Sequence, residues 1–136
     1  MERVKVYVGC ALRNAPEDFR QSVRDFKERI RTNFHILDFM GVLDGSVPDS
    51  QIRAFDLKNV EACDLMIAEC SYPSLWLGME IQHALAHEKS LLVIAHIRAN
   101  VSSMVLGIPE ECATIIRYEH MREVERFLEE KYSMDS

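Results

Sequence analysis

Residues 64–97 read DLMIAECSYPSLWLGMEIQHALAHEKSLLVIAHI, and they contain two apolar runs separated by a helical pattern. The runs are DLMIAEC (64–70) and SLLVIAHI (90–97), whose length and composition are typical of buried strands. Between them, SYPS (71–74) predicts a turn, and residues 76–88 repeat apolar side chains at helical spacing. This order predicts two parallel strands joined by a crossover helix.

The rest of the chain continues the same alternation in both directions. The further expected strands are RVKVYVG (3–9), FHILD (34–38) and ATIIRY (113–118). The further expected helices span 16–31, 50–62 with Ser50 as a candidate cap, and 119–132. The order predicts an α/β fold: one domain over 1–136, with a doubly wound five-stranded parallel sheet in a Rossmann or flavodoxin-like three-layer sandwich.

In such sheets, ligands bind beyond the carboxyl ends of the strands. The segments expected at that edge are Gly9–Arg13, Phe39–Pro48, Glu69–Ser74 and His96–Ser103. Two long predicted loops, 40–50 and 98–111, lie at the same edge. We therefore expect the functional site there.

Composition narrows the function classes. The chain has 136 residues, and its net charge of −6 argues against nucleic acid as the main partner. The four cysteines lack CxxC spacing and are interpreted as reduced thiols rather than disulfides or zinc ligands. The charged N-terminus does not resemble a secretory signal, and no apolar run is long enough to span a membrane. We expect a cytoplasmic protein with no membrane partner.

Common cofactor and metal motifs are missing from the sequence. Only Gly9 follows the first strand, so GxGxxG is absent, as are GxxxxGK[ST], HExxH and GxSxG. His83 and His87 are four residues apart and share a helix face, but the sequence offers them no obvious third ligand. We expect a solvated histidine pair, and we expect neither a cofactor nor a metal.

Two carboxylates do not fit a simple amphipathic pattern. Glu80 lies at the edge of an apolar stripe near a predicted helix start, where it could merely complement the helix dipole. Gly78 beside it costs helix stability, and close approach of a ligand is one reason for such a glycine. Asp56 is four residues from both Ile52 and Val60, so it points inward with them and also with Phe55. If the two carboxylates converge, they provide the paired acids of glycosyl chemistry.

The spacing of these residues resembles a known family. The pattern is D-L-x(6)-D-L from residue 56, then A-E-x-S-x-P-S-x-x-x-G-x-E over 68–80, and A-L-A at 84–86. It is similar to the nucleoside 2-deoxyribosyltransferase family, and within it to the 2'-deoxynucleoside 5'-phosphate N-hydrolase branch. The resemblance covers residues 3–13 and about 52–107.

The resemblance implies catalytic roles for three residues. Glu80 falls on the glutamate that forms a covalent glycosyl intermediate. Asp56 falls on the aspartate that protonates the leaving base. Tyr7, in VYVG, falls on the tyrosine that orients the nucleophile and lines the sugar pocket.

It also implies a substrate-binding set. Arg13 falls near the phosphate, and Ser74 stands where the hydrolase branch has a phosphate-binding serine and the transferases tend to have aspartate. Ser102 matches a serine from a neighbouring subunit, and Met104 a nearby pocket methionine. These matches imply a homodimer or higher homo-oligomer with shared sites. With the adjoining glycines the expected binding residues are Gly9, Arg13, Ser74, Gly78, Ser102 and Met104.

Two residues depart from the hydrolase pattern. Ala11 replaces a serine donor in the loop after the first strand, and Trp76 replaces a frequent glycine, where it can close the pocket or stack on a base. The predicted function is hydrolysis of the base–sugar bond of a (deoxy)nucleoside 5'-monophosphate through a covalent glycosyl-glutamate intermediate. The alternatives are a deoxyribosyltransferase, which exchanges bases, and a non-catalytic nucleotide sensor of the same fold.

Overall fold

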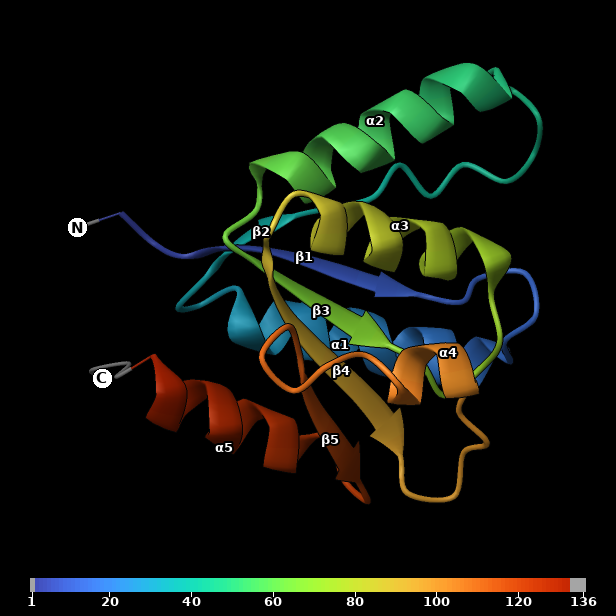
Figure 1. Ribbon diagram of the computed structural model, residues 1–136. Coiled ribbons are helices and arrows are strands. Elements are labelled where there is room, and N and C mark those ends of the chain that lie inside the picture. Colours follow the sequence, from blue (N-terminus) through green and yellow to red (C-terminus); the bar gives the residue numbers. More distant parts are fainter. Residues whose placement is uncertain (1, 133–136) are drawn as a thin grey trace.

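The computed structural model describes residues 2–132, so residues 1 and 133–136 of the expected 1–136 domain lie outside the described part. Its centre is a five-stranded parallel sheet with the order β2-β1-β3-β4-β5 (Figure 1). The strands are β1 (Lys5–Cys10), β2 (His35–Leu37), β3 (Leu65–Glu69), β4 (Ser90–His96) and β5 (Thr114–Tyr118). The predicted α/β class and parallel sheet are confirmed.

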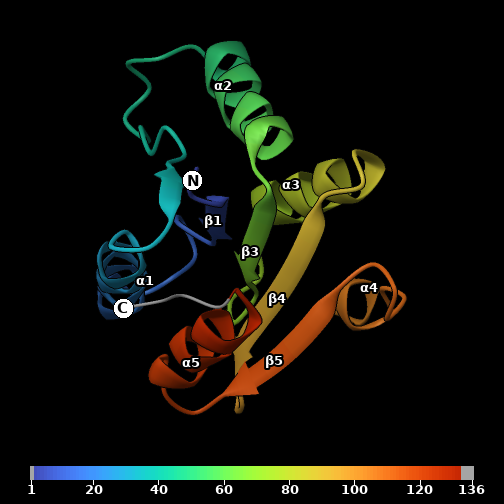
Figure 2. The same ribbon diagram turned by 90° about the vertical axis from the view of Figure 1, so that its left-hand side faces the viewer.

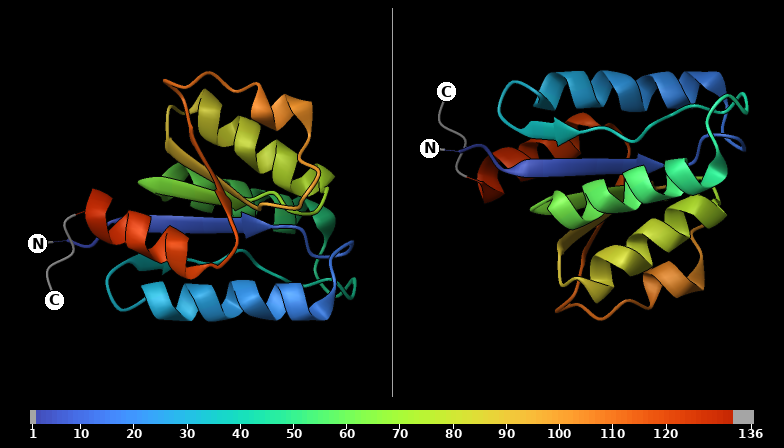
Figure 3. Two further views of the ribbon diagram at one scale, coloured as in Figure 1. Left: turned by 90° about the horizontal axis from the view of Figure 1, so that it is seen from below. Right: turned by 90° about the horizontal axis from the view of Figure 1, so that it is seen from above.

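Helices cover both faces of the sheet (Figure 2). They are α1 (Glu17–Ile30), α2 (Asp49–Ala62), α3 (Leu75–Ala86), α4 (Ser103–Leu106) and α5 (Arg122–Lys131). The apolar stripes of α1 and α5 pack on one face, whereas α2 and α3 close the other, with α4 beside α3 (Figure 3). This gives three layers with a core on each side of the sheet. Among residues 2–132, no helix combines the length and apolar character needed to cross a membrane.

The strand order places a topological switch between β1 and β3. The chain passes from β1 outward to β2 and then returns to the other side of β1 to form β3. Connections that leave in opposite directions open a crevice at the carboxyl ends of the two strands. The first residues of α3 and the segment after β1 meet at this crevice, which positions the site described below.

Three local expectations were wrong. The helix predicted at 50–62 begins at Asp49 after Pro48, so Ser50 lies inside its first turn and is not the cap. Phe55 is 43% exposed and does not share the buried face of Asp56. The predicted loop 98–111 contains the short helix α4, which Ser102 caps by accepting a hydrogen bond from the Met104 amide. A helix of this length gives too weak a periodic signal to be found in sequence.

Candidate active site

Tyr7 and Glu80 form a buried contact between the sheet and α3. Tyr7 lies in the middle of β1 and is fully buried, and its hydroxyl donates a hydrogen bond to Glu80 Oε2. Glu80 is only 3% exposed. It lies in the second turn of α3 rather than the first, because the helix begins at Leu75. The helix dipole therefore explains this carboxylate less well than the contact with Tyr7 does.

Gly9 permits the approach of Glu80 to the sheet. A Cβ atom at this position would lie 3.1 Å from Glu80 Oε1 and 2.9 Å from Leu77 Cδ1. Both separations are shorter than an ordinary van der Waals contact. Gly9 therefore acts behind the carboxylate, as part of the surface against which Glu80 is fixed.

The environment of Glu80 favours its neutral form. Burial raises the pKa of Glu80 from 4.5 to about 7, and the negative charge of Asp56 adds to the rise. The hydrogen bond from Tyr7 stabilises the carboxylate and opposes this rise in pKa, as does the nearby Trp76 side chain. The same burial, together with Glu80, raises the pKa of Tyr7, so its hydroxyl remains a donor at neutral pH. A carboxylate that titrates near neutrality inside a cavity is typical of an active site.

Asp56 reaches the same cavity from α2. It is 1% exposed, and its Oδ1 atom accepts a hydrogen bond from the Met40 amide at 2.9 Å. Its buried Oδ2 atom has no hydrogen-bond partner among residues 2–132. Burial raises the pKa of Asp56, against the opposing effects of Met40 and Trp76. An unpaired buried carboxylate oxygen is the natural place for a proton that can be passed to a ligand.

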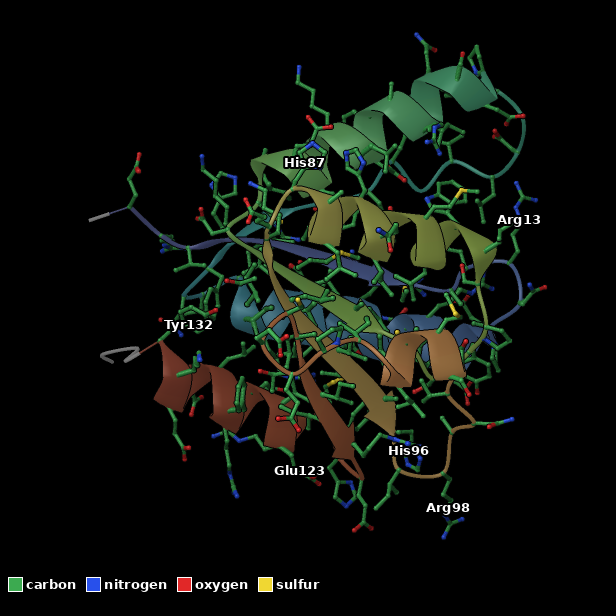
Figure 4. All side chains as sticks on the ribbon, viewed as in Figure 1. Arg13, His87, His96, Arg98, Glu123 and Tyr132 are labelled. Atoms are coloured by element: carbon green, nitrogen blue, oxygen red, sulfur yellow. The ribbon has the colours of Figure 1, made fainter. Side chains whose placement is uncertain are left out.

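These carboxylates line a cavity of about 620 Å³. Ser74 and Arg13 lie on its wall as well. Ser74 caps α3, since its Oγ accepts a hydrogen bond from the Leu77 amide at 3.0 Å, and its own O–H can still donate to a ligand. Arg13 is exposed and projects at the end of the molecule where α3 begins (Figure 4). The cavity thus combines buried acids with a positively charged rim.

Four expected binding residues do not line this cavity. Gly9 lies behind Glu80, and Gly78 is exposed, with open space where its Cβ would be. Ser102 caps α4, and Met104 is 86% exposed. The binding role of Gly78 stays a prediction, and the roles of Ser102 and Met104 stay predictions that require a second subunit.

Several lining residues were not singled out in the sequence. Arg53 brings a second positive charge, Asn14 comes from the loop after β1, and Met79 accepts a contact from Arg53 Nη1 at 3.7 Å. The position of Arg53, three residues before Asp56 on the same helix, could have indicated it. Asn14 carried no such signal, because the position of a loop residue depends on the folded path between elements. Phe39 lies in the segment that was expected at this edge.

Another buried carboxylate, that of Glu69, supports the turn before α3. Glu69 is fully buried, and it accepts hydrogen bonds from the Ser71 amide at 2.6 Å, the Ser71 hydroxyl at 2.8 Å and the Tyr118 hydroxyl. The Ser71 Oγ atom in turn accepts a hydrogen bond from the His96 amide at 2.8 Å. This network ties the carboxyl ends of β3, β4 and β5 to the turn that carries Ser74.

Searches for known proteins gave sequence relatives and structural neighbours, whereas no family model matches. The chain is 37% identical over 78 residues to a Syntrophotalea carbinolica protein named "Putative 2'-deoxynucleoside 5'-phosphate N-hydrolase 1", with 56% of this chain and 54% of that protein aligned. A Thermofilum pendens protein of the same name is 26% identical over 127 residues, 88% of this chain and 89% of that protein. The chain thus spans about half the length of the first relative and most of the second.

Solved structures share the fold at low identity. The Clostridium botulinum CMP N-glycosidase BcmB has a TM-score of 0.72 and 18% identity, over 93% of this chain and 98% of that one. A 2-deoxyribosyltransferase from Bacillus psychrosaccharolyticus has a TM-score of 0.64 and 11% identity, over 89% of this chain and 90% of that one. The resemblance predicted from the sequence is confirmed: the chain is similar in sequence to curated relatives named as N-hydrolases, and it shares its fold with an N-glycosidase and a 2-deoxyribosyltransferase.

Proposed function

We propose that the protein is an N-glycosidase that hydrolyses the bond between base and sugar in a nucleoside 5'-monophosphate. The observation that carries this proposal is the convergence of Glu80 and Asp56 on one cavity, with Arg13 and Ser74 on its wall. Tyr7 was expected to line the sugar pocket, but it is fully buried behind Glu80 and reaches the site only through its hydrogen bond to that carboxylate. The names of the curated relatives and of the structural neighbours, which cleave or transfer glycosyl bonds, support the reaction class.

In the proposed reaction, a Glu80 oxygen attacks C1' of the sugar while the C1'–N bond to the base breaks. Asp56 gives its proton to the departing base, and Tyr7 holds the second Glu80 oxygen through its hydroxyl. Water then attacks C1' of the glycosyl ester, loses a proton to Asp56, and releases Glu80 as a carboxylate. Two steps of this kind replace one difficult displacement.

The charge state that this reaction needs is one proton shared by two carboxyl groups. Each charge disfavours ionisation of the other, so the first proton to leave is lost more easily than the second. The reactive form has the proton on Asp56, whose Oδ2 has no hydrogen-bond donor among the described residues. Burial of Glu80 opposes this form, whereas the hydrogen bond from Tyr7 favours it by stabilising a charged Glu80.

A 5'-phosphate fits the rim of the cavity better than a neutral hydroxyl would. Arg13 and Arg53 provide positive charge there, and the Ser74 hydroxyl can donate to a phosphate oxygen while still capping α3. Asp49, also in the wall, opposes them. Charge-assisted hydrogen bonds contribute about 1.5–3 kcal/mol each, so two of them favour the monophosphate by about two orders of magnitude or more in kcat/KM.

We also propose that the active form is a homo-oligomer. Ser102 and Met104 would then reach the phosphate end of a neighbouring subunit's cavity, as the family resemblance implies. Leu75 is 82% exposed beside this edge and Met104 is 86% exposed, so both have apolar surface available for such a contact.

The reduced thiols of Cys10, Cys63 and Cys70, all buried, suit a cytoplasmic protein.

The proposal is tested by incubating the protein with a panel of nucleosides and their 5'-monophosphates and measuring free base by chromatography. We expect base release from monophosphates, loss of release in Glu80→Gln, and a Ser74→Asp variant that loses activity on the monophosphate more than on the nucleoside. Faster transfer of sugar to an added base than to water would replace hydrolysis by base exchange. Binding without turnover would instead indicate a nucleotide sensor.

A further inference from the structure

Glu61, His83 and His87 form a cluster at the end of α3 remote from the candidate active site. Each offers one ligand atom, and these atoms lie within 4.8 Å of one another. His83 Nε2 is 2.7 Å from Glu61 Oε2, and the ring centroids of His83 and His87 are 4.3 Å apart. The cluster joins the last turn of α2 to the last turns of α3, and His87 is seen beside the end of α2 in Figure 4.

The hydrogen bonding of His87 prepares it for a metal. Its Nδ1 atom is 2.9 Å from the His83 carbonyl oxygen. Because a carbonyl oxygen only accepts, Nδ1 carries the hydrogen, and the lone pair of the neutral ring is left on Nε2. Metal-ligating histidines almost always donate their second ring N–H to such a carbonyl or carboxylate.

We propose that Glu61, His83 and His87 bind a divalent transition-metal ion of the Zn²⁺ type at the surface between α2 and α3. Imidazole and carboxylate are the ligands of three-residue zinc sites, in which water completes a tetrahedron. Metal–ligand distances of about 2.0–2.2 Å require ligand atoms about 3.3 Å apart. On binding the ion, His83 Nε2 and Glu61 Oε2 would move slightly apart to reach this spacing. The His87 ring would move toward them by rotation of its side chain.

This proposal replaces the expectation of a solvated histidine pair. The sequence shows the two histidines on one helix but not the third ligand, which comes from another helix 22 residues away. The ion would cross-link the two helices that carry Asp56 and Glu80, and so would stabilise their relative position. It would not contact the reacting atoms, because the three ligands lie at the surface between the last turns of α2 and α3, whereas Glu80 is buried against Tyr7 of the sheet.

Neighbouring charges set the conditions for binding. The Lys89 ammonium lies near Glu61 and opposes a bound cation. We therefore expect a Lys89→Gln variant to bind the ion more tightly.

The test uses the untagged protein, with Zn²⁺ as the probe, in a Cys112→Ser background that removes the exposed thiol. Isothermal titration should show one Zn²⁺ per chain, and thermal unfolding should shift upward with Zn²⁺ but not with Mg²⁺. His87→Ala and His83→Ala should each weaken binding about tenfold or more, with circular dichroism confirming the fold. His120→Ala, at an exposed histidine outside the cluster, is the matched control and should leave binding unchanged.

Two results would overturn the proposal. One is the absence of saturable Zn²⁺ binding at neutral pH. The other is binding that survives both His83→Ala and His87→Ala. In either case the contact between His83 and Glu61 is an ordinary surface hydrogen bond. Neither result bears on base release, which is measured separately.

Discussion

Glu80→Gln should make the protein more stable and inactive at the same time. The substitution keeps the size of the side chain and an oxygen that can accept the Tyr7 hydrogen bond, but it removes the ionisable group. Wild-type Glu80 has a pKa raised from 4.5 to about 7, mainly by burial. When a catalytic residue destabilises the folded state, its replacement raises stability and lowers activity.

The size and pH range of the effect follow from the two pKa values. Below pH 4.5 the carboxyl group is protonated in both the folded and the unfolded chain, and it costs no stability. Between pH 4.5 and 7 the unfolded chain loses its proton first, so wild-type stability falls as the pH rises. The full difference corresponds to about 3 kcal/mol. We therefore expect Glu80→Gln to exceed the wild type by about 2–3 kcal/mol at pH 8, and by less than about 1 kcal/mol at pH 5.

Urea unfolding of both proteins between pH 5 and pH 8 measures this difference. Glu130→Gln makes the same chemical change on the exposed face of α5, and it should change stability by less than about 0.5 kcal/mol at every pH. The reasoning fails if Glu80→Gln is destabilised to the same extent at both ends of the range, since Glu80 would then not carry a buried charge at pH 8.

Further predictions concern the residues around Glu80. Asp56→Asn should lower turnover by about 10²–10⁴, and should remove the basic limb of the kcat/KM profile, because that limb reports the loss of the Asp56 proton. A basic limb that survives the substitution would show that Asp56 does not supply the proton. Gly9→Ala places a methyl group 3.1 Å from Glu80 Oε1 and should reduce kcat/KM at least about tenfold without loss of helicity; full activity would remove its positioning role. Tyr118→Phe should cost about 1–3 kcal/mol in urea unfolding by removing a donor to buried Glu69, and an unchanged midpoint would contradict that.

Much of the fold is predictable because its signals are local. The apolar runs at 64–70 and 90–97 correspond to β3 and β4 within one or two residues, and the helix between them appears as α3. Alternation along the chain also implies the parallel sheet, because parallel strands need crossover connections. The sequence did not predict features that depend on a few residues. Examples are the start of α2 at Asp49 and the short helix α4 inside a predicted loop.

The candidate site is predictable only in part. Asp56 and Glu80 stand out because each lies on an apolar helix face, and the topology places both helices at one crevice. Glu69 and Glu61 could not be found in this way. Glu69 belongs to a buried strand whose partner Tyr118 is 49 residues distant, and Glu61 meets His83 only once α2 lies beside α3. Contacts between elements follow from packing, which no local pattern encodes.

The central claim is that Glu80 forms a covalent bond to C1' of the sugar. Mass spectrometry of protein quenched in acid during turnover, with a 2'-fluorinated nucleoside monophosphate to slow hydrolysis of the intermediate, tests this claim most directly. We predict a sugar-phosphate adduct on the peptide that contains Glu80, and no adduct in Glu80→Gln. Base release with the adduct on another residue, or steady turnover in Glu80→Gln, would contradict the mechanism.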